Sequence, residues 1–435
     1  MSPGASPIRP PIPGIERALS LRDVDDVDAL VAAIPRARTA VIFGGGFIGI
    51  AMTENLVHRG LDVALVEAQE QVMAPLDPEM AAPVQDALRA AGVTLRLNDQ
   101  VLQIGPDSVT TAAGVSLPAD LVVAALGVRP ETTLAATAGL TLGPRGGIAV
   151  DDRQRTSNPD IYAVGDATEK LDALDGDATL VPLANTANLG GRRVADDIAG
   201  LPMSQRPVLG TAIVGVFGLQ VAVTGANEKR LKTVGRPYRS IHTHPLSHAG
   251  YYPGAEGLAL KLLVDPESDA ILGAQGVGRA GVDKRMDVLA TAITGGITAS
   301  ELANLELAYA PQFGSAKDPV NLLGYVADNL RTGVMRTLPW DKLDATLAEG
   351  AILVDVRTEA EHAGGAIPGS ILIPLDELRG RLGEIPPGPV VVHCAVGVRG
   401  HTAARILTQH GRDTVNLDGG YRTWAAGRGV TTKAR

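Results

Sequence analysis

The chain contains a single residue able to act as a thiol nucleophile, Cys394, in the segment VVVHCAVGVRG. The apolar run 390–393 predicts a buried strand and residues 400–410 predict a helix, so the loop 394–399 joins the two. A sulfur at a strand end that faces a helix N-terminus meets backbone N–H groups and the positive end of the helix dipole. Because Arg399 adds a permanent positive charge, the environment favours a thiolate nucleophile over the alternative, an inert buried cysteine.

A second group of residues has the spacing of a dinucleotide-binding loop. Gly44, Gly46 and Gly49 form a GxGxxG pattern where a predicted strand at 39–43 leads into a predicted helix at 47–58. These glycines permit a tight turn, a close approach of the backbone to a pyrophosphate, and packing of the helix on the strand. Glu67 follows the next predicted strand, where a carboxylate binds a ribose 2′-hydroxyl and repels a 2′-phosphate. The pattern predicts NADH binding, with NADPH less favoured; the alternative is a glycine-rich unit that binds no nucleotide.

Two further segments place polar or flexible groups at predicted strand ends. The segment ADLVVAALGVRPET predicts a buried strand that ends in a turn at Gly127, which is a candidate cofactor-binding residue. The following Arg129 and Pro130 are expected to be turn residues without a ligand. In TSNPDIYAVGDATE, a predicted strand IYAV leads into Gly165 and Asp166. A carboxylate is therefore expected at a strand end where a helix could begin.

The length and composition of the chain limit the classes of function that it can have. At 435 residues the chain is long enough for two to four domains. A net charge of -9 argues against a nucleic-acid or anionic-membrane partner, and the sequence has neither a membrane-length apolar run nor a signal-peptide pattern. One cysteine permits no intrachain disulfide, which fits a reducing, cytoplasmic setting.

The C-terminal part, residues 340–424, resembles rhodanese domains, which carry sulfur as a cysteine persulfide. The resemblance is carried by ILVDVRTEAEH, GAIPGSILIPLDEL and LDGGYRTW together with the Cys394 loop. Protein phosphatases related to this fold have a loop one residue longer, with Arg six places after Cys. Here Arg399 comes five places after Cys394, and the tighter ring suits one sulfur atom better than a phosphate. Ala366 departs from the pattern, because many rhodaneses have His at that place.

The order of segments in the rest of the chain resembles the coenzyme A disulfide reductases that are fused to a C-terminal rhodanese domain. That group also includes reductases of persulfides and polysulfides. The most specific stretches are HAGYYPGAEG, GVDKRMDVLATAI and LAYAPQFGSAKDPVN. The resemblance implies a homodimer, an FAD held at its ribityl chain by Gly165-Asp166, and a CoA substrate contacted by Tyr252 and Tyr309. The alternative for each tyrosine is an ordinary position between core and surface.

The start of the chain departs from that family. Residues 1–38 contain neither the strand–GxGxxG–helix that binds the FAD diphosphate nor the redox cysteine, and Ala51 stands where relatives carry Glu. A half-domain of about 100 residues is absent relative to the family, and we expect an N-terminally shortened product. One charge-assisted hydrogen bond contributes about 1.5–3 kcal/mol, whereas nanomolar binding needs about 12 kcal/mol. We therefore expect the 435 residues alone to bind flavin weakly and to show negligible NADH-dependent CoA-disulfide reduction.

The sequence therefore predicts an α/β protein with Rossmann-like nucleotide-binding parts, an α+β dimerisation domain and a C-terminal rhodanese-like α/β domain. The expected boundaries are a remnant of the FAD-binding domain at 1–30, an NAD(P)H-binding domain at 31–150, a second FAD-binding segment at 151–205, the dimerisation domain at 206–328, a linker at 329–339 and the rhodanese domain at 340–428.

The segment HTHPLSH offers three histidines, His242, His244 and His248, of the type that binds zinc. Pro245 indicates a loop, whereas histidine ligands usually lie on rigid elements with fixed partners. We therefore predict no metal at these histidines.

The predicted function is a flavin- and NAD(P)H-dependent disulfide or persulfide reductase of the CoA-disulfide type, coupled to a rhodanese domain that carries sulfane sulfur on Cys394. The expected partners are CoA disulfide, CoA persulfide or another low-molecular-weight persulfide, and polysulfide. The alternative is a sulfurtransferase alone, in which the nucleotide-binding part is inactive as a reductase. A phosphatase is disfavoured by the length of the Cys394 loop.

Overall fold

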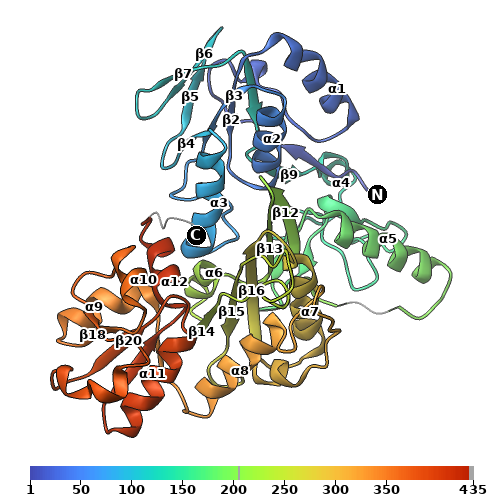
Figure 1. Ribbon diagram of the computed structural model, residues 1–435. Coiled ribbons are helices and arrows are strands. Elements are labelled where there is room, and N and C mark those ends of the chain that lie inside the picture. Colours follow the sequence, from blue (N-terminus) through green and yellow to red (C-terminus); the bar gives the residue numbers. More distant parts are fainter. Residues whose placement is uncertain (204–205, 431–435) are drawn as a thin grey trace. The chain divides into compact units, whose positions relative to one another are not determined.

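A computed structural model describes residues 1–203 and 206–430, which form two compact units (Figure 1). Unit 1 contains residues 1–74 and 85–217, and unit 2 contains residues 75–84 and 218 onward. Both units combine helices with sheets, so the predicted α/β class is confirmed. The predicted boundary at residue 205 lies outside the described residues. Within the described part of the chain, none of the helices has both the length and the apolar character that a membrane crossing requires.

The main sheet of unit 1 contains four parallel strands in the order β4–β3–β2–β8. Strands β2, β3 and β8 are almost completely buried apolar runs, as expected for a parallel sheet covered on both faces. The predicted strand at 39–43 and helix at 47–58 are confirmed. The chain leads from β2 to β3 on one side of β2, whereas β8 is added on the other side, so the order of strands reverses at β2. Open α/β sheets bind ligands at the carboxyl ends of the strands at such a point. The bounds are β2 Thr39–Phe43, α2 Phe47–His58, β3 Asp62–Val66, β4 Thr94–Arg96 and β8 Leu121–Ala124.

The other elements of unit 1 correct two predictions. Arg129 and Pro130 are not turn residues, because they lie in strand β9, which pairs antiparallel with β1. The segment IYAV forms no strand before Gly165, where a short 3-10 helix, η3 (Gly165–Ala167), begins. The remaining bounds are β1 Ala5–Pro7, α1 Val24–Ala33, β5 Val101–Ile104, β6 Ser108–Thr111, β7 Ser116–Pro118, β9 Val128–Pro130, α4 Thr133–Thr137, β10 Lys170–Leu171, β11 Ala178–Thr179, α5 Ala184–Ile198 and β12 Ala212–Val216; α3, Pro78–Ala90, runs from unit 2 into unit 1.

The first part of unit 2 is an antiparallel sheet in which β13, β16, β15 and β14 follow one another. Strands β15 and β16 form an antiparallel hairpin, and every residue of β16 is buried. Helices α7 and α8 contribute to the apolar core of this part. A short 3-10 helix, η4 (Ser300–Asn304), lies between α7 and α8 in the chain. The bounds are β13 Leu219–Gly225, α6 Glu228–Thr233, β14 Arg239–Thr243, β15 Leu258–Val264, β16 Ile271–Gly278, α7 Val282–Gly295 and α8 Pro319–Arg331.

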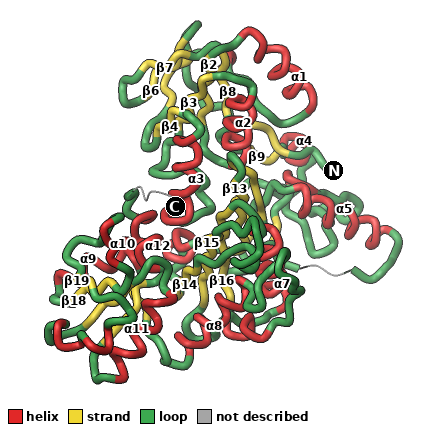
Figure 2. The backbone as a smooth tube through the Cα atoms, viewed as in Figure 1, coloured by secondary structure: helices red, strands yellow, loops and turns green. Residues whose placement is uncertain are grey.

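The second part of unit 2 is a parallel five-stranded sheet in the order β17–β21–β20–β18–β19. Figure 2 shows its strands among helices α9 to α12. The predicted strand at 390–393 is confirmed as β20, which lies at the centre of the sheet and is completely buried. The bounds are β17 Thr337–Leu338, α9 Leu343–Ala348, β18 Ile352–Asp355, α10 Glu359–Ala363, β19 Ile371–Leu372, β20 Val390–His393, α11 Val398–Gln409, β21 Thr414–Leu417 and α12 Gly420–Gly427.

Candidate functional site

Cys394 lies directly after the central strand β20, and its side chain is buried. Gly397 has a left-handed φ of 94°, and its backbone N–H donates to the Cys394 Sγ at 3.2 Å. Helix α11 begins at Val398, two residues earlier than predicted, because Gly397 already acts as its N-cap. The sulfur is therefore held by a backbone donor beside the positive end of a helix dipole.

Arg399 forms a bidentate ion pair with Glu361, which the sequence did not predict. Its two terminal nitrogens donate to the carboxylate oxygens at 2.8 and 2.6 Å. Glu361 lies in α10 and also accepts from the backbone N–H of Thr358 at 3.0 Å. The hydrogen bond from Arg399 lowers the pKa of Glu361 to about 2. The pKa of Arg399 is raised, first by Glu361 and also by the nearby Cys394. A carboxylate of a separate helix thus fixes the guanidinium close to the thiol.

A second arginine braces the region beneath the loop. Arg357 binds the Asp355 carboxylate through Nε and Nη2 and donates to the Gly365 carbonyl at 2.8 Å. Its guanidinium carbon lies 4.2 Å from the centre of the Tyr421 ring. Burial lowers the pKa of the adjacent His393 to about 4, although Asp355 acts in the opposite direction. His393 is therefore a neutral, buried residue that supports the loop.

The first turn of α12 closes the Cys394 loop from the other side. The backbone N–H of Tyr421 donates to the Cys394 carbonyl at 2.8 Å, and that of Arg422 donates to the Ala395 carbonyl at 3.0 Å. Gly420 has a φ of 63°, and a Cβ at this position would lie 2.4 Å from the Cys394 carbonyl oxygen. Only glycine allows this close approach, so the LDGGY stretch forms a second loop of the site.

The glycines of the GxGxxG loop differ in the space around them. A Cβ on Gly44 would lie 2.3 Å from the Ala125 carbonyl oxygen, and a Cβ on Gly49 would lie 1.8 Å from that of Gly44. By contrast, a Cβ on Gly46 would have no atom within 4 Å. The first and third glycines are therefore needed for packing, and the second borders open space that a pyrophosphate could enter.

Glu67 follows β3 and contacts the GxGxxG loop directly. Its Oε2 accepts from the backbone N–H of Gly45 at 2.6 Å, and its Oε1 accepts from that of Gln69 at 2.8 Å. A carboxylate oxygen has further acceptor capacity, so these bonds leave it able to bind a ribose hydroxyl. The geometry adds a role that the sequence did not indicate, because Glu67 also holds the loop.

The residues expected at a flavin lie in unit 1. Gly165 has a left-handed φ of 86°, and Asp166 follows it in η3 with a half-buried side chain. None of the described residues gives the Asp166 carboxylate a hydrogen bond, so it can accept one from a ribityl hydroxyl. Gly127 has a φ of 90°, and its carbonyl accepts from Ile8 at 3.0 Å. These groups fit the ribityl part of FAD.

The two tyrosines expected at the substrate lie in unit 2 and are exposed, Tyr252 at 42% and Tyr309 at 49%. They do not bond each other. The Tyr309 hydroxyl lies 3.0 Å from that of Tyr251, a residue that was not predicted, whereas Tyr252 packs edge-to-face on His248. Both rings are available to a molecule outside this chain.

The three histidines of HTHPLSH do not converge. His242 lies on the rigid strand β14, contrary to the predicted loop, and its ring nitrogens face the carboxylates of Asp418 and Glu79 at 2.5 and 2.9 Å. His244 bonds a threonine hydroxyl of α12 at 2.7 Å, and His248 bonds a neighbouring backbone carbonyl. Each ring thus has partners of its own.

A buried charge cluster lies next to His242. Lys261 on β15 is completely buried, and its ammonium contacts Asp77 at 2.8 Å, Glu228 at 2.6 Å and Glu79. Oxygens of the three carboxylates lie within 4.8 Å of one another, a spacing that would suit a metal ion. The Lys261 ammonium supplies the balancing positive charge instead. The sequence signal for this cluster was a single lysine inside the apolar strand LALKLLV.

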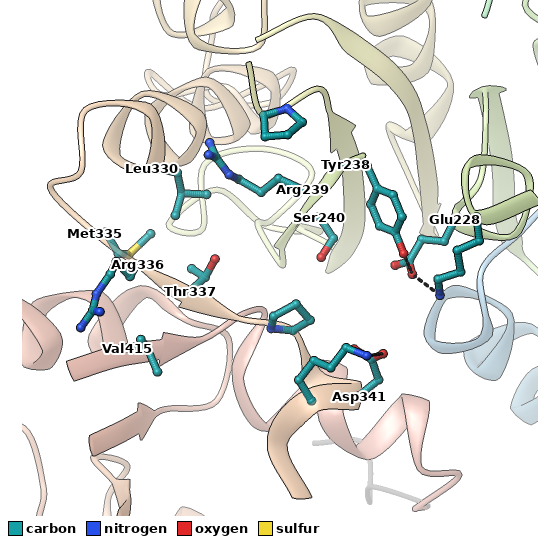
Figure 3. Close-up of a pocket in the computed structure, with 14 residues that line it drawn as sticks. Glu228, Tyr238, Arg239, Ser240, Leu330, Met335, Arg336, Thr337, Asp341 and Val415 are labelled. Carbon is teal, nitrogen blue, oxygen red and sulfur yellow. Dashed lines mark hydrogen bonds and ion pairs between the residues drawn. The ribbon is translucent and has the colours of Figure 1, made fainter. Parts of the chain in front are cut away.

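Unit 2 also has a cavity of about 580 Å³ between β14 and the segment that leads into β17. Figure 3 shows Tyr238 and Glu228 next to each other on its wall, where the Tyr238 hydroxyl donates to Glu228 at 2.7 Å. Two of its cations already have acidic partners, since Lys232 pairs with Glu228 and Arg336 with Asp413. None of the residues predicted for catalysis or cofactor binding lines this cavity.

Comparison with known families divides the chain into three matches. Residues 1–189 match the pyridine nucleotide-disulphide oxidoreductase model, residues 211–319 its dimerisation domain, and residues 340–427 the rhodanese-like domain. A coenzyme A disulfide reductase of Staphylococcus haemolyticus is 33% identical over 314 residues, which cover 72% of this chain and 71% of that protein. The chain belongs to the pyridine nucleotide-disulphide oxidoreductase family, whose members use FAD and NAD(P)H, and carries a rhodanese-like domain.

Two solved structures match nearly the whole chain. Reduced CoADR-RHD of Bacillus anthracis is 46% identical, with a TM-score of 0.96, and the match covers 98% of this chain and 78% of that one. A NAD-dependent persulfide reductase from A. fulgidus is 37% identical, with a TM-score of 0.90, and covers 97% of this chain and 79% of that one. Both share the arrangement of oxidoreductase and rhodanese parts that the sequence predicted.

Proposed function

We propose that the protein is a flavin- and NADH-dependent disulfide or persulfide oxidoreductase whose rhodanese domain carries sulfane sulfur on Cys394. The observation that carries the proposal is the geometry of the single thiol. Its sulfur accepts from a left-handed Gly397 beside a helix N-terminus, with Arg399 fixed nearby, in a chain that also holds a dinucleotide-binding loop.

The sulfur step follows from this geometry. The Cys394 thiolate attacks the sulfane sulfur of a donor such as thiosulfate, the sulfur–sulfur bond of the donor breaks, and sulfite leaves with the bonding electron pair. Cys394 keeps the transferred sulfur as a persulfide anion. The Gly397 N–H and the first turn of α11 stabilise negative charge in the loop, and the Arg399 guanidinium attracts the anionic donor.

The nucleotide-binding residues would act in unit 1. The open space at Gly46 supports a pyrophosphate there, between Gly44 and Gly49, and the Glu67 carboxylate would bind the adenosine ribose of NADH. Asp166 and Gly165 would hold the ribityl chain of FAD, with Gly127 in the neighbouring turn. When bound, FAD supplies electron transfer between a nicotinamide and a sulfur–sulfur bond.

The match to a dimerisation domain supports a homodimer. CoA disulfide and persulfides are the substrates named for the relatives, and we propose them for this chain, with polysulfide as a further donor. The exposed rings of Tyr252 and Tyr309 are proposed to contact the CoA substrate.

A second candidate is a sulfurtransferase without reductase activity. It is favoured by one observation, that Cys394 is the only thiol among the 435 residues and lies in the rhodanese domain.

One experiment separates the two candidates. The protein is mixed with FAD and NADH, and NADH oxidation is followed on addition of CoA disulfide or CoA persulfide, while sulfur transfer from thiosulfate to cyanide is measured in parallel. Substrate-dependent NADH oxidation supports the reductase and would contradict the weak flavin binding that the sequence predicts for these 435 residues. Sulfur transfer without any NADH oxidation leaves the second candidate, and the absence of both activities contradicts the proposal.

A further inference from the structure

His242 links two parts of unit 2 through both of its ring nitrogens. Nδ1 lies 2.5 Å from the Asp418 Oδ2, and Nε2 lies 2.9 Å from the Glu79 Oε1. The backbone N–H of His242 also donates to the Asp418 Oδ1 at 3.0 Å. The three side chains are buried. A histidine of the strand β14 thus binds an aspartate of the rhodanese-like domain by two hydrogen bonds.

The contacts require His242 to be charged. An ionised carboxylate only accepts hydrogen bonds, so a ring with a carboxylate at each nitrogen donates from both and is an imidazolium. Burial alone would lower the pKa of His242, but Asp418 and Glu79 raise it to about 9. Lys261 shares Glu79 with His242 and also binds Asp77 and Glu228, and Arg422 faces His244.

Asp418 lies three residues before Tyr421, whose backbone N–H donates to the Cys394 carbonyl. It follows β21 and precedes Gly419 and Gly420, which begin α12. The next two N–H groups, those of Tyr421 and Arg422, donate to carbonyls of the Cys394 loop. The turn that carries Asp418 is therefore the turn on which the Cys394 loop rests.

The turn at residues 418–420 is tightly packed against both His242 and the Cys394 loop. A Cβ on Gly419 would lie 2.8 Å from the His242 Cβ, and a Cβ on Gly420 would lie 2.4 Å from the Cys394 carbonyl oxygen. A displacement of the turn would therefore disturb its contacts with the Cys394 loop. A second bond, from His244 to Thr423 of α12, supports the same face.

We propose that His242, which lies outside the rhodanese-like domain, is a positioning residue for Cys394. Through Asp418 it holds the first turn of α12 against the loop, and this keeps the Gly397 N–H directed at the sulfur. The inference rests on the proposed role of Cys394 as the sulfur carrier. It implies that the thiol is fully reactive only while the rhodanese-like domain is docked on β14.

Two substitutions of His242 separate its two contacts. In His242→Asn, the amide nitrogen takes the place of Nδ1 and keeps the bond to Asp418. In His242→Gln, the amide nitrogen takes the place of Nε2 and keeps the bond to Glu79, whereas the side-chain bond to Asp418 is lost and only the backbone N–H bond to Asp418 remains. A general packing role would make the two variants alike, whereas the proposal predicts that only the glutamine variant is impaired.

The readout uses the fact that Cys394 is the only thiol of the chain. Alkylation by iodoacetamide is followed by intact-mass spectrometry between about pH 6 and pH 9, around the ordinary thiol range. We expect His242→Gln to slow alkylation at neutral pH by about three- to tenfold, the scale of one hydrogen bond to the sulfur. The pH–rate profile of this variant should shift to higher pH, because the thiolate loses a stabilising donor. His242→Asn and the control His410→Ala, at the far end of α11, should behave like the wild type.

Sulfur loading from thiosulfate is measured on the same proteins. Slower alkylation and loading in the glutamine variant alone supports the proposal, whereas equal rates in the glutamine and asparagine variants overturn it. If His242→Gln does not fold by circular dichroism, Asp418→Asn removes the same charged contact. Slower alkylation and loading of Asp418→Asn than of the wild type then supports the proposal, and wild-type rates overturn it. A wild type that is alkylated normally but never loads sulfur would contradict the proposed function. The alkylation rates of the variants would still test the positioning role of His242.

Discussion

At the scale of single residues, the chemistry of the site depends on partners that lie far away in the sequence. Arg399 was expected to influence Cys394 by its charge alone, but its guanidinium is fixed by Glu361 of another helix. Glu67 was expected at the ribose of NADH, and it also holds the backbone of Gly45. In both cases the local motif identified the residue, and the fold supplies the contact that orients it.

Because Arg399 forms a bidentate pair with Glu361, we expect that a positive charge alone at position 399 is not enough for full sulfur loading of Cys394. A lysine cannot reproduce the two parallel hydrogen bonds of the guanidinium, so Arg399→Lys should slow sulfur loading of Cys394 by about tenfold. Because the pair is partly exposed, the free energy of unfolding should change by less than about 1 kcal/mol. Loading kinetics and urea unfolding test this, with Arg405→Lys on the same helix as the control. A wild-type loading rate in Arg399→Lys would show that only the charge matters.

Nucleotide preference tests the role of Glu67. In Glu67→Arg, the ribose loses its carboxylate partner and a 2′-phosphate gains a charge-assisted one, so the ratio of NADPH to NADH affinity should rise by about ten- to a hundredfold. Glu67→Gln, which keeps the shape but not the charge, should give a smaller change. Calorimetric titration with both nucleotides measures the ratio. Equal affinities in the wild type would rule out this role of the carboxylate.

At the scale of elements, the sequence predicted what short-range patterns determine. The strands at 39–43 and 390–393 and the helix at 47–58 were correct, because apolar runs and glycine positions specify them locally. Strand β9 was missed, since its Arg129 and Pro130 form a strand only by pairing with Ser6 and Ala5. The turn at Gly420 and the His242–Asp418 link were missed for the same reason, because each joins segments that are distant along the chain.

The charge cluster at Lys261 ties the start of α3 and helix α6 to strand β15. In Lys261→Met, three carboxylates would share a buried space without their cation, so the free energy of unfolding should fall by about 3–5 kcal/mol. Lys229→Met, an exposed position on α6, should change it by less than about 0.5 kcal/mol. Urea denaturation followed by circular dichroism compares the two variants. Equal stability of both would mean that the cluster does not hold these elements together.

At the scale of the whole molecule, the family matches and the geometry agree on an oxidoreductase joined to a rhodanese-like domain. The sequence motifs identified both parts, because each motif is a contiguous stretch of residues. How the second part is held against its neighbour became visible only in the structure, through His242 and Asp418.

The central claim is that Cys394 carries sulfane sulfur, and intact-mass spectrometry after incubation with thiosulfate tests it most directly. The account predicts that the wild-type chain gains the mass of one sulfur atom, that cyanide or a thiol removes it, and that Cys394→Ser gains none while keeping its fold. A wild type that gains no sulfur, or a serine variant that does, would contradict it.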